Sequence, residues 1–222
     1  MKRVLLLLIL FTTCAGAVGA QEGRAMLGVK GGHNALFGHY ASISADVDYE
    51  AQRHFAIYGG AQYGTIGSVA AELRPQYFHD FNFGRLSGEL LLGGVYQGSV
   101  HNYVVGCGVE LDVSYIWATL GYYHRTLKLG NGSLLEPFNI YYEFGIRCLP
   151  KCKLWDLNVV VTNSRHFEVE RHYQPSLSVD AWWYPCDRFA LQFGVCYKPA
   201  GMFHISSDYY QLYASVGVCY RW

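Results

Sequence analysis

The residues best suited to chemistry lie near the carboxyl end of the chain, in the stretch "FHISSDYY". His204, Ser206 and Asp208 supply the groups that nucleophilic hydrolysis requires: a base, a hydroxyl nucleophile and a carboxylate that orients the base. A polar surface loop would contain the same residue types. The stretch therefore supports a hydrolase only as an alternative hypothesis.

A second candidate is the stretch "RHFEVERHY". If this segment is extended, His166, Glu168, Glu170 and His172 fall on one face and offer nitrogen and oxygen ligands of the kind that divalent metal ions accept. A solvated surface loop with charges of both signs would contain the same residue types, and no HExxH motif occurs in the chain. We therefore expect neither a metal ion nor another cofactor.

The beginning of the chain predicts export. Lys2 and Arg3 precede the apolar run "VLLLLILF" at residues 4–11, and the small residues of "AGAVGA" follow. This is the pattern of a secretory signal peptide, and the run is too short to span a membrane as a helix. We expect cleavage after Ala20, which leaves residues 21–222 as one domain.

The composition narrows the class of protein. Aromatic residues make up 16% of the chain, with 19 Tyr and 25 Gly, whereas charged residues make up only 15%, against a typical ~25%. The formal net charge is zero, so nothing favours nucleic acid as a partner. After the leader no apolar run is long enough for a membrane helix. A secreted chain of this kind is either a soluble β-sandwich or a membrane β-barrel.

Strict alternation of apolar and small or polar residues predicts the secondary structure. In "QLYASVGVCYRW", for example, Leu212, Ala214, Val216 and Val218 share one face, as in a strand with two chemically different faces. Similar segments are expected near residues 24–32, 39–49, 54–65, 68–80, 85–98, 102–113, 116–127, 137–148, 153–164, 175–184, 188–198 and 209–222. We therefore predict about twelve strands, with ten or eight as alternatives.

The connections and faces favour a barrel over a sandwich. Tight connections such as "FNFGR" and "YPCDR" alternate with longer polar ones, "GNGSLLEP", "RHFEVERHYQP" and "KPAGMFHISS", as in transmembrane barrels. Aromatic residues near strand ends would form an interfacial girdle: Tyr96, Tyr142, Trp155, Trp183, Tyr197, Tyr210, Tyr220 and Trp222. We predict an all-β, closed antiparallel up-and-down transmembrane β-barrel, with the soluble β-sandwich binding module as an alternative.

Six cysteines follow Cys14, and an oxidising compartment would allow disulfides. Cys148 and Cys152 flank one predicted turn and could form a bridge across it. Cys186, in the next turn on that side, is expected near the level of Cys219. Cys107 should face lipid and Cys196 the interior, both as thiols.

The chain resembles the small outer-membrane β-barrel proteins of Gram-negative bacteria, most closely in style those of the Bacteroidetes. The resemblance rests on the alternating ending "YASVGVCYRW", with Val218, Tyr220 and the terminal Trp222. It implies that this ending is an assembly signal for the barrel-assembly machinery, and that the protein contacts outer-membrane lipid and lipopolysaccharide. It names no activity.

With the polar face inward, the lumen would contain charges of both signs. The nine acids are Asp46, Asp48, Glu72, Glu89, Glu110, Asp112, Glu143, Asp156 and Asp180, and the eight bases are Lys30, Arg74, Arg85, Arg125, Arg147, Arg188, Lys198 and Arg221. A selective pore carries a ring of one sign at its constriction, so near balance favours a cross-linked, filled interior, with a narrow pore as the alternative. The expected role is structural, binding or passive transport of small solutes.

The predicted strands also give a position for the stretch "FHISSDYY". His204, Ser206 and Asp208 would lie at the outer rim between the last two strands, similar to the arrangement in outer-membrane lipid A deacylases of the PagL type. The chain departs from that motif, since Ser207 replaces the Asn that follows the serine and the acid lies much closer. A deacylase-like hydrolase therefore remains an alternative.

Overall fold

A computed structural model describes residues 22–34, 38–52, 54–65, 67–130, 132–165, 168–169, 175–199 and 211–222. Twelve strands form a closed antiparallel barrel: β1 (Glu22–Asn34), β2 (Gly38–Gln52), β3 (Phe55–Gly64), β4 (Ser68–Phe81), β5 (Gly84–Gln97), β6 (Val100–Val113), β7 (Ile116–Leu129), β8 (Gly132–Arg147), β9 (Trp155–Thr162), β12 (Ser176–Cys186), β13 (Phe189–Lys198) and β14 (Gln211–Arg221). The short strands β10 (Ser164–Arg165) and β11 (Glu168–Val169) form a separate two-stranded sheet. The predicted barrel of twelve strands is confirmed.

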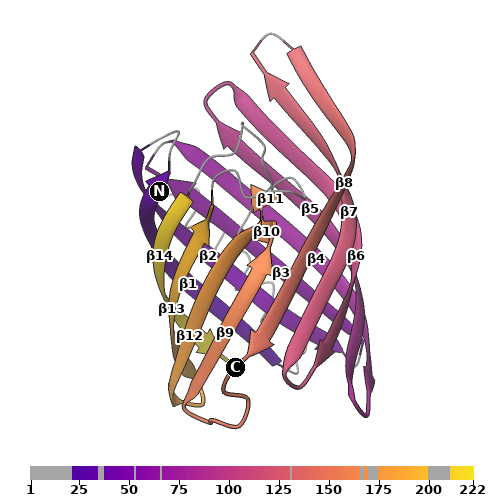
Figure 1. The fold of residues 1–222 in the computed structure, drawn as a ribbon, viewed down its shortest axis with the longest axis vertical. Helices are drawn as coiled ribbons and strands as arrows, with labels where there is room; N and C mark the ends of the chain where they lie inside the picture. The colour runs from indigo at the N-terminus through magenta and orange to yellow at the C-terminus, as the bar shows by residue number, and fades with distance from the viewer. Residues whose placement is uncertain are drawn as a thin grey trace.

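The barrel closes where the first strand meets the last (Figure 1). β1 pairs with β2 on one side and with β14 on the other, so Leu27 lies opposite both Ala45 and Val218. Every wall strand pairs with two neighbours, so the sheet has no free edge where these strands pair. The alternatives of a β-sandwich and of eight or ten strands are therefore wrong.

The two faces of the wall differ as the alternation predicts. Each wall strand exposes large apolar side chains outward, such as Leu90, Val105 and Val216. Aromatic side chains stack on this outer face, including Trp155 on Trp183 with ring centroids 6.2 Å apart. The neighbouring residues in each strand point inward and are polar, small, or buried apolar side chains such as Leu91 and Tyr141. An apolar exterior around a polar interior is the pattern of a barrel that sits in lipid.

The two ends of the barrel differ. At the turn end, the lower end in Figure 1, lie Glu22, Trp222 and the connections β2–β3, β4–β5, β6–β7, β8–β9 and β12–β13. At the opposite, loop end, the connections at 65–67, 98–99 and 130–131 are also tight, and Gly98 adopts a positive φ of 57° there. The segment "GNGSLLEP" was predicted as a long loop, but most of it belongs to β8. The β7–β8 hairpin projects above the rest of the wall (Figure 1).

Aromatic side chains fill part of the lumen against β5–β8. Leu91, Val104, Tyr123 and Tyr141 form a buried cluster. A Cβ atom at Gly108 or Gly121 would collide with the ring of Tyr141. The small residues of the inner face therefore make room for large inward side chains, which explains the high glycine content of these strands.

Candidate functional site

The lumen contains a cavity of about 480 Å³ whose lining is strongly acidic. Seven acids line it, namely Asp48, Glu72, Glu89, Glu110, Asp112, Glu143 and Asp180, against two arginines, Arg24 and Arg74. Asp48 and Asp112 lie toward the turn end, where both are ion-paired to arginines. We call the other five acids, Glu72, Glu89, Glu110, Glu143 and Asp180, the acidic belt.

Neutral donors hold most of the acidic belt in place. Glu89 accepts hydrogen bonds from the Tyr141 hydroxyl at 2.7 Å and from the Gln76 amide at 3.1 Å. Glu143 accepts from the indole N–H of Trp117 at 2.7 Å.

The other two belt acids with neutral donors follow the same pattern. Glu110 accepts from the Thr119 hydroxyl at 3.1 Å, and Asp180 from the Gln192 amide at 3.2 Å. These bonds orient the carboxylates without neutralising their charge.

Arg74, on β4, is one of the two arginines among the described residues that line the cavity. Its guanidinium group is ion-paired to Glu72 and lies 3.9 Å from a carboxylate oxygen of Glu89. It also donates a 3.1 Å hydrogen bond to the Ser164 hydroxyl. One arginine therefore serves two carboxylates and reaches a third element.

Ser164 comes from a segment that leaves the wall. It follows β9, and the strands β8, β7, β6 and β5 separate β9 from β4 in the closed order. Ser164 is only 4% exposed and lines the cavity. A contact with Arg74 therefore requires the chain at residues 163–165 to turn into the lumen.

Asn163 makes this turn. Its side-chain oxygen accepts a 2.7 Å hydrogen bond from the Tyr142 N–H, and its side-chain nitrogen donates a 2.8 Å bond to the Ile140 carbonyl. β9 does not continue beside this part of β8. The Asn163 side chain therefore supplies the hydrogen-bond partners of the Tyr142 N–H and the Ile140 carbonyl. The inward segment narrows the cavity on the side of the acidic belt.

At the turn end, four arginines lie against aromatic rings, and we call them the arginine collar. The distances from guanidinium carbon to ring centroid are 5.8 Å for Arg24 over Trp182, 3.8 Å for Arg85 over Phe78, 4.9 Å for Arg147 over Trp117 and 5.6 Å for Arg221 over Tyr184. Three of them also have acidic partners: Arg24 pairs with Asp48, Arg147 with Asp112, and Arg85 with both Asp80 and Glu50. Stacking and ion pairing together fix these side chains.

Toward the loop end, the inward charges are basic. Lys30 lies with its ammonium group 4.8 Å from the ring centroid of Tyr213. Lys198 ends β13 at this end of the barrel, and Arg125 lies in the loop-end half of β7. None of the three lines the cavity.

The charges of the lumen are therefore sorted along its axis. The near balance of the predicted lumen charges does not extend to the cavity, where seven acids face two arginines, because the predicted bases lie mostly toward the two ends of the barrel. Arg188, predicted inside, is exposed in the β12–β13 turn.

Among the remaining predicted lumen residues, Asp46 is buried and accepts a 3.1 Å hydrogen bond from the Tyr58 hydroxyl, and two others lie near the turn end. Asp156 accepts a 3.2 Å hydrogen bond from the Tyr184 hydroxyl, and Arg221 lies over the same ring. Arg24, Trp117 and Trp182 were not identified from the sequence. Arg24 could have been found, since it shares the inward face of β1 with Lys30 under a period of two.

The residues predicted to form an assembly signal lie at the seam between β1 and β14. Tyr220 pairs with Ala25, Val218 with Leu27, and Trp222 exchanges backbone hydrogen bonds of 3.3 and 3.1 Å with Gly23. Tyr220 and Trp222 stack with centroids 6.1 Å apart. The last residue is thus part of the closed wall, as the sequence suggested.

Several predicted residues lie outside the described part of the chain. They are His166, Glu170, His172, His204, Ser206, Asp208 and Tyr210, and of Glu168 only the backbone is described. Within the described ranges, no three His, Cys, Asp or Glu side chains are grouped so that they could hold a metal ion. The hydrolase and metal hypotheses thus stay untested predictions.

The structure holds all six described cysteines as free thiols, so neither predicted disulfide is formed. Cys186 pairs with Phe189 on β13, which in turn pairs with Tyr220 on β14. β13 therefore separates Cys186 from Cys219, and two strand spacings of ~4.8 Å put their Cα atoms beyond the ~7 Å limit for a disulfide. Cys148 and Cys152 lie exposed in the β8–β9 turn, Cys107 lies on the outer face, and Cys196 is buried inside.

No helix in the described ranges is long and apolar enough to cross a membrane. No protein-family model matches the sequence, and no curated protein is similar to it.

Solved structures resemble the fold at low sequence identity. The translocator domain of the autotransporter NalP from Neisseria meningitidis superposes with a TM-score of 0.59 at 12% identity, covering 100% of this chain and 98% of that one. The KdgM porin superposes at 0.53 with 13% identity, covering 88% and 98%. The outer membrane phospholipase A from Escherichia coli superposes at 0.53 with 6% identity, covering 94% and 96%. A translocator, a porin and a phospholipase share this architecture, so the likeness shows a closed β-barrel fold and does not indicate the activity.

Proposed function

We propose that this protein is a narrow, cation-preferring channel for small solutes in a bacterial outer membrane. The acidic belt carries the proposal, because the described residues that line this cavity include seven acids, five of them in the belt, against the two arginines Arg24 and Arg74. Carboxylates that line a constriction attract cations and repel anions. The inward segment at Asn163 and Ser164 keeps the path narrow, which increases the effect of each fixed charge.

The exterior supports the membrane location. Exposed apolar side chains on all twelve wall strands would be costly in water over so large a surface and favourable in lipid. Even strand number puts the turn end and both chain ends on the periplasmic side. The proposal has four further parts, which the sequence supports. They are a signal peptide at residues 1–20, recognition of the chain ending by the barrel-assembly machinery, contact with lipopolysaccharide, and an origin in the Bacteroidetes.

The site supports transport, because the described residues supply a polar cavity lined by seven acids against two arginines. Hydrolysis is the alternative hypothesis. A lipid A deacylase predicts that Ser206→Ala abolishes a change in lipid A acylation, and that assay separates the two hypotheses.

The test is the reversal potential of the refolded protein in a planar bilayer under a salt gradient. We expect cations to permeate several times better than anions. Replacing Glu110 and Glu143 by Gln removes two belt charges and keeps both hydrogen bonds, and should reduce the cation-to-anion permeability ratio by about 10-fold, the effect of ~1.4 kcal/mol.

The matched control neutralises an ion pair outside the belt. Asp112→Asn together with Arg147→Gln removes one charge of each sign from the arginine collar and should leave the ratio unchanged. A wild-type channel without cation preference, or a silent bilayer containing protein shown to be folded, would overturn the proposal.

A further inference from the structure

A second space opens at the turn end, beside the seam. This mouth pocket has a volume of about 810 Å³ and is lined by Glu22, Gly23, Arg24, Asp48, Glu50, Asp187, Arg188, Tyr220, Arg221 and Trp222. Arg24 and Asp48 also line the acidic cavity, so the two spaces adjoin. The volume lies within the ~300–1,000 Å³ range of small-molecule sites.

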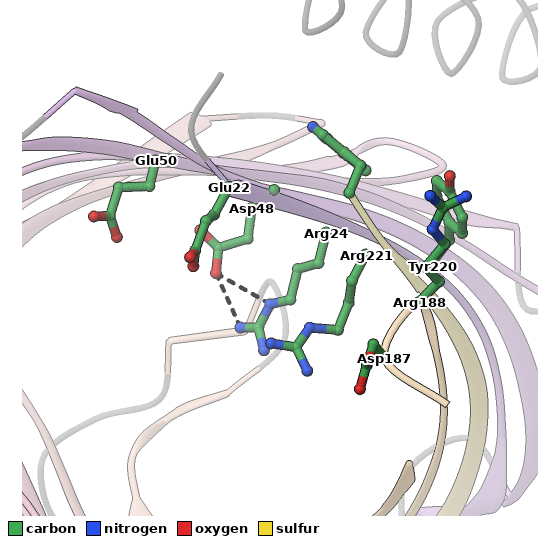
Figure 2. A pocket seen from close by; sticks show the side chains of 10 residues that line it. Glu22, Arg24, Asp48, Glu50, Asp187, Arg188, Tyr220 and Arg221 are labelled. Atoms are coloured by element: carbon green, nitrogen blue, oxygen red, sulfur yellow. Dashed lines mark hydrogen bonds and ion pairs between the residues drawn. The ribbon is translucent and has the colours of Figure 1, made fainter. Parts of the chain in front are cut away.

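Two arginines face each other across the seam. Arg24 on β1 is the direct register partner of Arg221 on β14, and Figure 2 shows both guanidinium groups extending side by side into the pocket. Like charges placed directly opposite each other in an antiparallel pair are destabilising. Such a pair is favourable when an anion binds between or beside the two groups.

The two arginines are not equally occupied. The guanidinium of Arg24 is held by Asp48, with a nitrogen–oxygen distance of 3.0 Å. Arg221 stacks on Tyr184 at 5.6 Å and makes no ion pair with any residue in the described ranges. Stacking uses the face of a guanidinium group and leaves its planar N–H donors for a carboxylate.

Three of the four acids that line the pocket lie on the other side, whereas Asp187 lies on the side of Arg221 and Arg188 (Figure 2). In Figure 2, Glu22, Asp48 and Glu50 lie together, whereas Arg221 and Arg188 lie beyond Arg24. Glu50 is already ion-paired to Arg85 at 3.2 Å. Glu22 has no ion pair with a described residue, so the pocket offers a free carboxylate on one side and a free guanidinium on the other.

We propose that the mouth pocket binds small zwitterions of the amino-acid type, with the carboxylate on Arg221 and Arg24 and the ammonium group on Glu22 and Asp48. Asp187 and Arg188 complete the charged lining. The proposal rests on the channel function proposed above and names its solute. When the molecule passes from the mouth pocket into the lumen, its ammonium group would enter the acidic belt first.

The test is calorimetric titration of the detergent-solubilised full chain, which requires no conduction. The probes are L-alanine, propionate, which lacks the ammonium group, and isopropylamine, which lacks the carboxylate. We expect alanine to bind at least ~10-fold more tightly than either analogue, since each analogue loses the charge-assisted hydrogen bonds at one end of the ligand.

Three variants assign the two ends of the ligand. Arg221→Gln should weaken alanine and propionate by about 10-fold, and Glu22→Gln should weaken alanine and leave propionate unchanged. Lys151→Gln, in the exposed β8–β9 turn and outside both cavities, is the control and should change neither affinity. Heat-dependent migration on SDS gels confirms that each variant is folded.

Equal affinities for alanine and propionate would overturn the proposal of a zwitterionic ligand and indicate a site for anions alone. Absence of alanine binding, or binding that Arg221→Gln leaves intact, would also overturn it. A silent bilayer with intact alanine binding would contradict the channel and leave this site standing.

Discussion

The acidic belt and the arginine collar lie next to each other in one lumen but solve the problem of inward charge in different ways. In the collar, each arginine lies over an aromatic ring, and Arg24, Arg85 and Arg147 also have carboxylate partners. In the belt, Arg74 is shared by Glu72 and Glu89. Hydrogen bonds from neutral groups reach Glu89, Glu110, Glu143 and Asp180.

This difference indicates two kinds of inward charge. Charges in the collar stabilise the barrel, whereas charges in the belt face a permeating solute. A paired and stacked arginine has its donors filled, so removing a partner costs stability. A carboxylate bonded to Thr or Trp keeps its net charge, so replacing it by an amide changes the field in the lumen more than the stability. Stability and selectivity should therefore respond to different substitutions.

The largest expected effect is at Arg74, where the two regions meet, because Glu72 and Glu89 share it while buried. Arg74→Met should lower the free energy of unfolding by about 3–5 kcal/mol, the usual cost of breaking a buried ion pair. Urea titration of the protein in lipid vesicles measures this loss. Arg74→Lys keeps the charge and should lose much less, and a Met variant as stable as the wild type would contradict the assignment.

A matched pair of single substitutions tests the comparison directly. Asp112→Asn removes one partner of a bidentate pair with Arg147, whose nitrogen–oxygen distances are 2.7 and 2.8 Å. It should cost about 1–3 kcal/mol and should move the reversal potential less than Glu110→Gln does. Glu110→Gln still accepts from Thr119 and should cost less than about 1 kcal/mol while lowering cation preference. If both variants shifted stability and selectivity equally, the distinction between belt and collar would fail.

The smallest effect is expected at the seam. A methyl group at Gly23 would collide with the Trp222 indole, so Gly23→Ala should displace that ring and cost about 1 kcal/mol by overpacking. Gly88→Ala is the control, because no atom lies within 4 Å of the position that its Cβ would occupy. The fraction of heat-resistant barrel on SDS gels after refolding reports both, and equal yields would contradict a role for the indole in closure.

The wall was predictable from the sequence because its signal is local. Alternation in segments such as "QLYASVGVCYRW" identified all twelve wall strands and their outward faces. The start of β8 was missed, since adjacent Leu134 and Leu135 interrupt the alternation and "GNG" indicates a turn.

The distribution of charge along the axis was not predictable in the same way. It depends on the pairing register, which relates residues on different strands, and no local pattern encodes that. The inward turn at Asn163 has the same origin, because it is recognisable only once Tyr142 and Ile140 are known to lie beside it.

That turn at Asn163 also leaves one margin of the wall exposed. β8 pairs with β9 only from Glu143 to Arg147, so within the described ranges residues 132–139 have a strand neighbour in β7 alone. An unpaired margin invites another chain to add a strand, which is a route to aggregation. Pro137 lies in this margin and has no amide hydrogen to offer an incoming strand. The projecting hairpin thus carries its own protection against association through its edge.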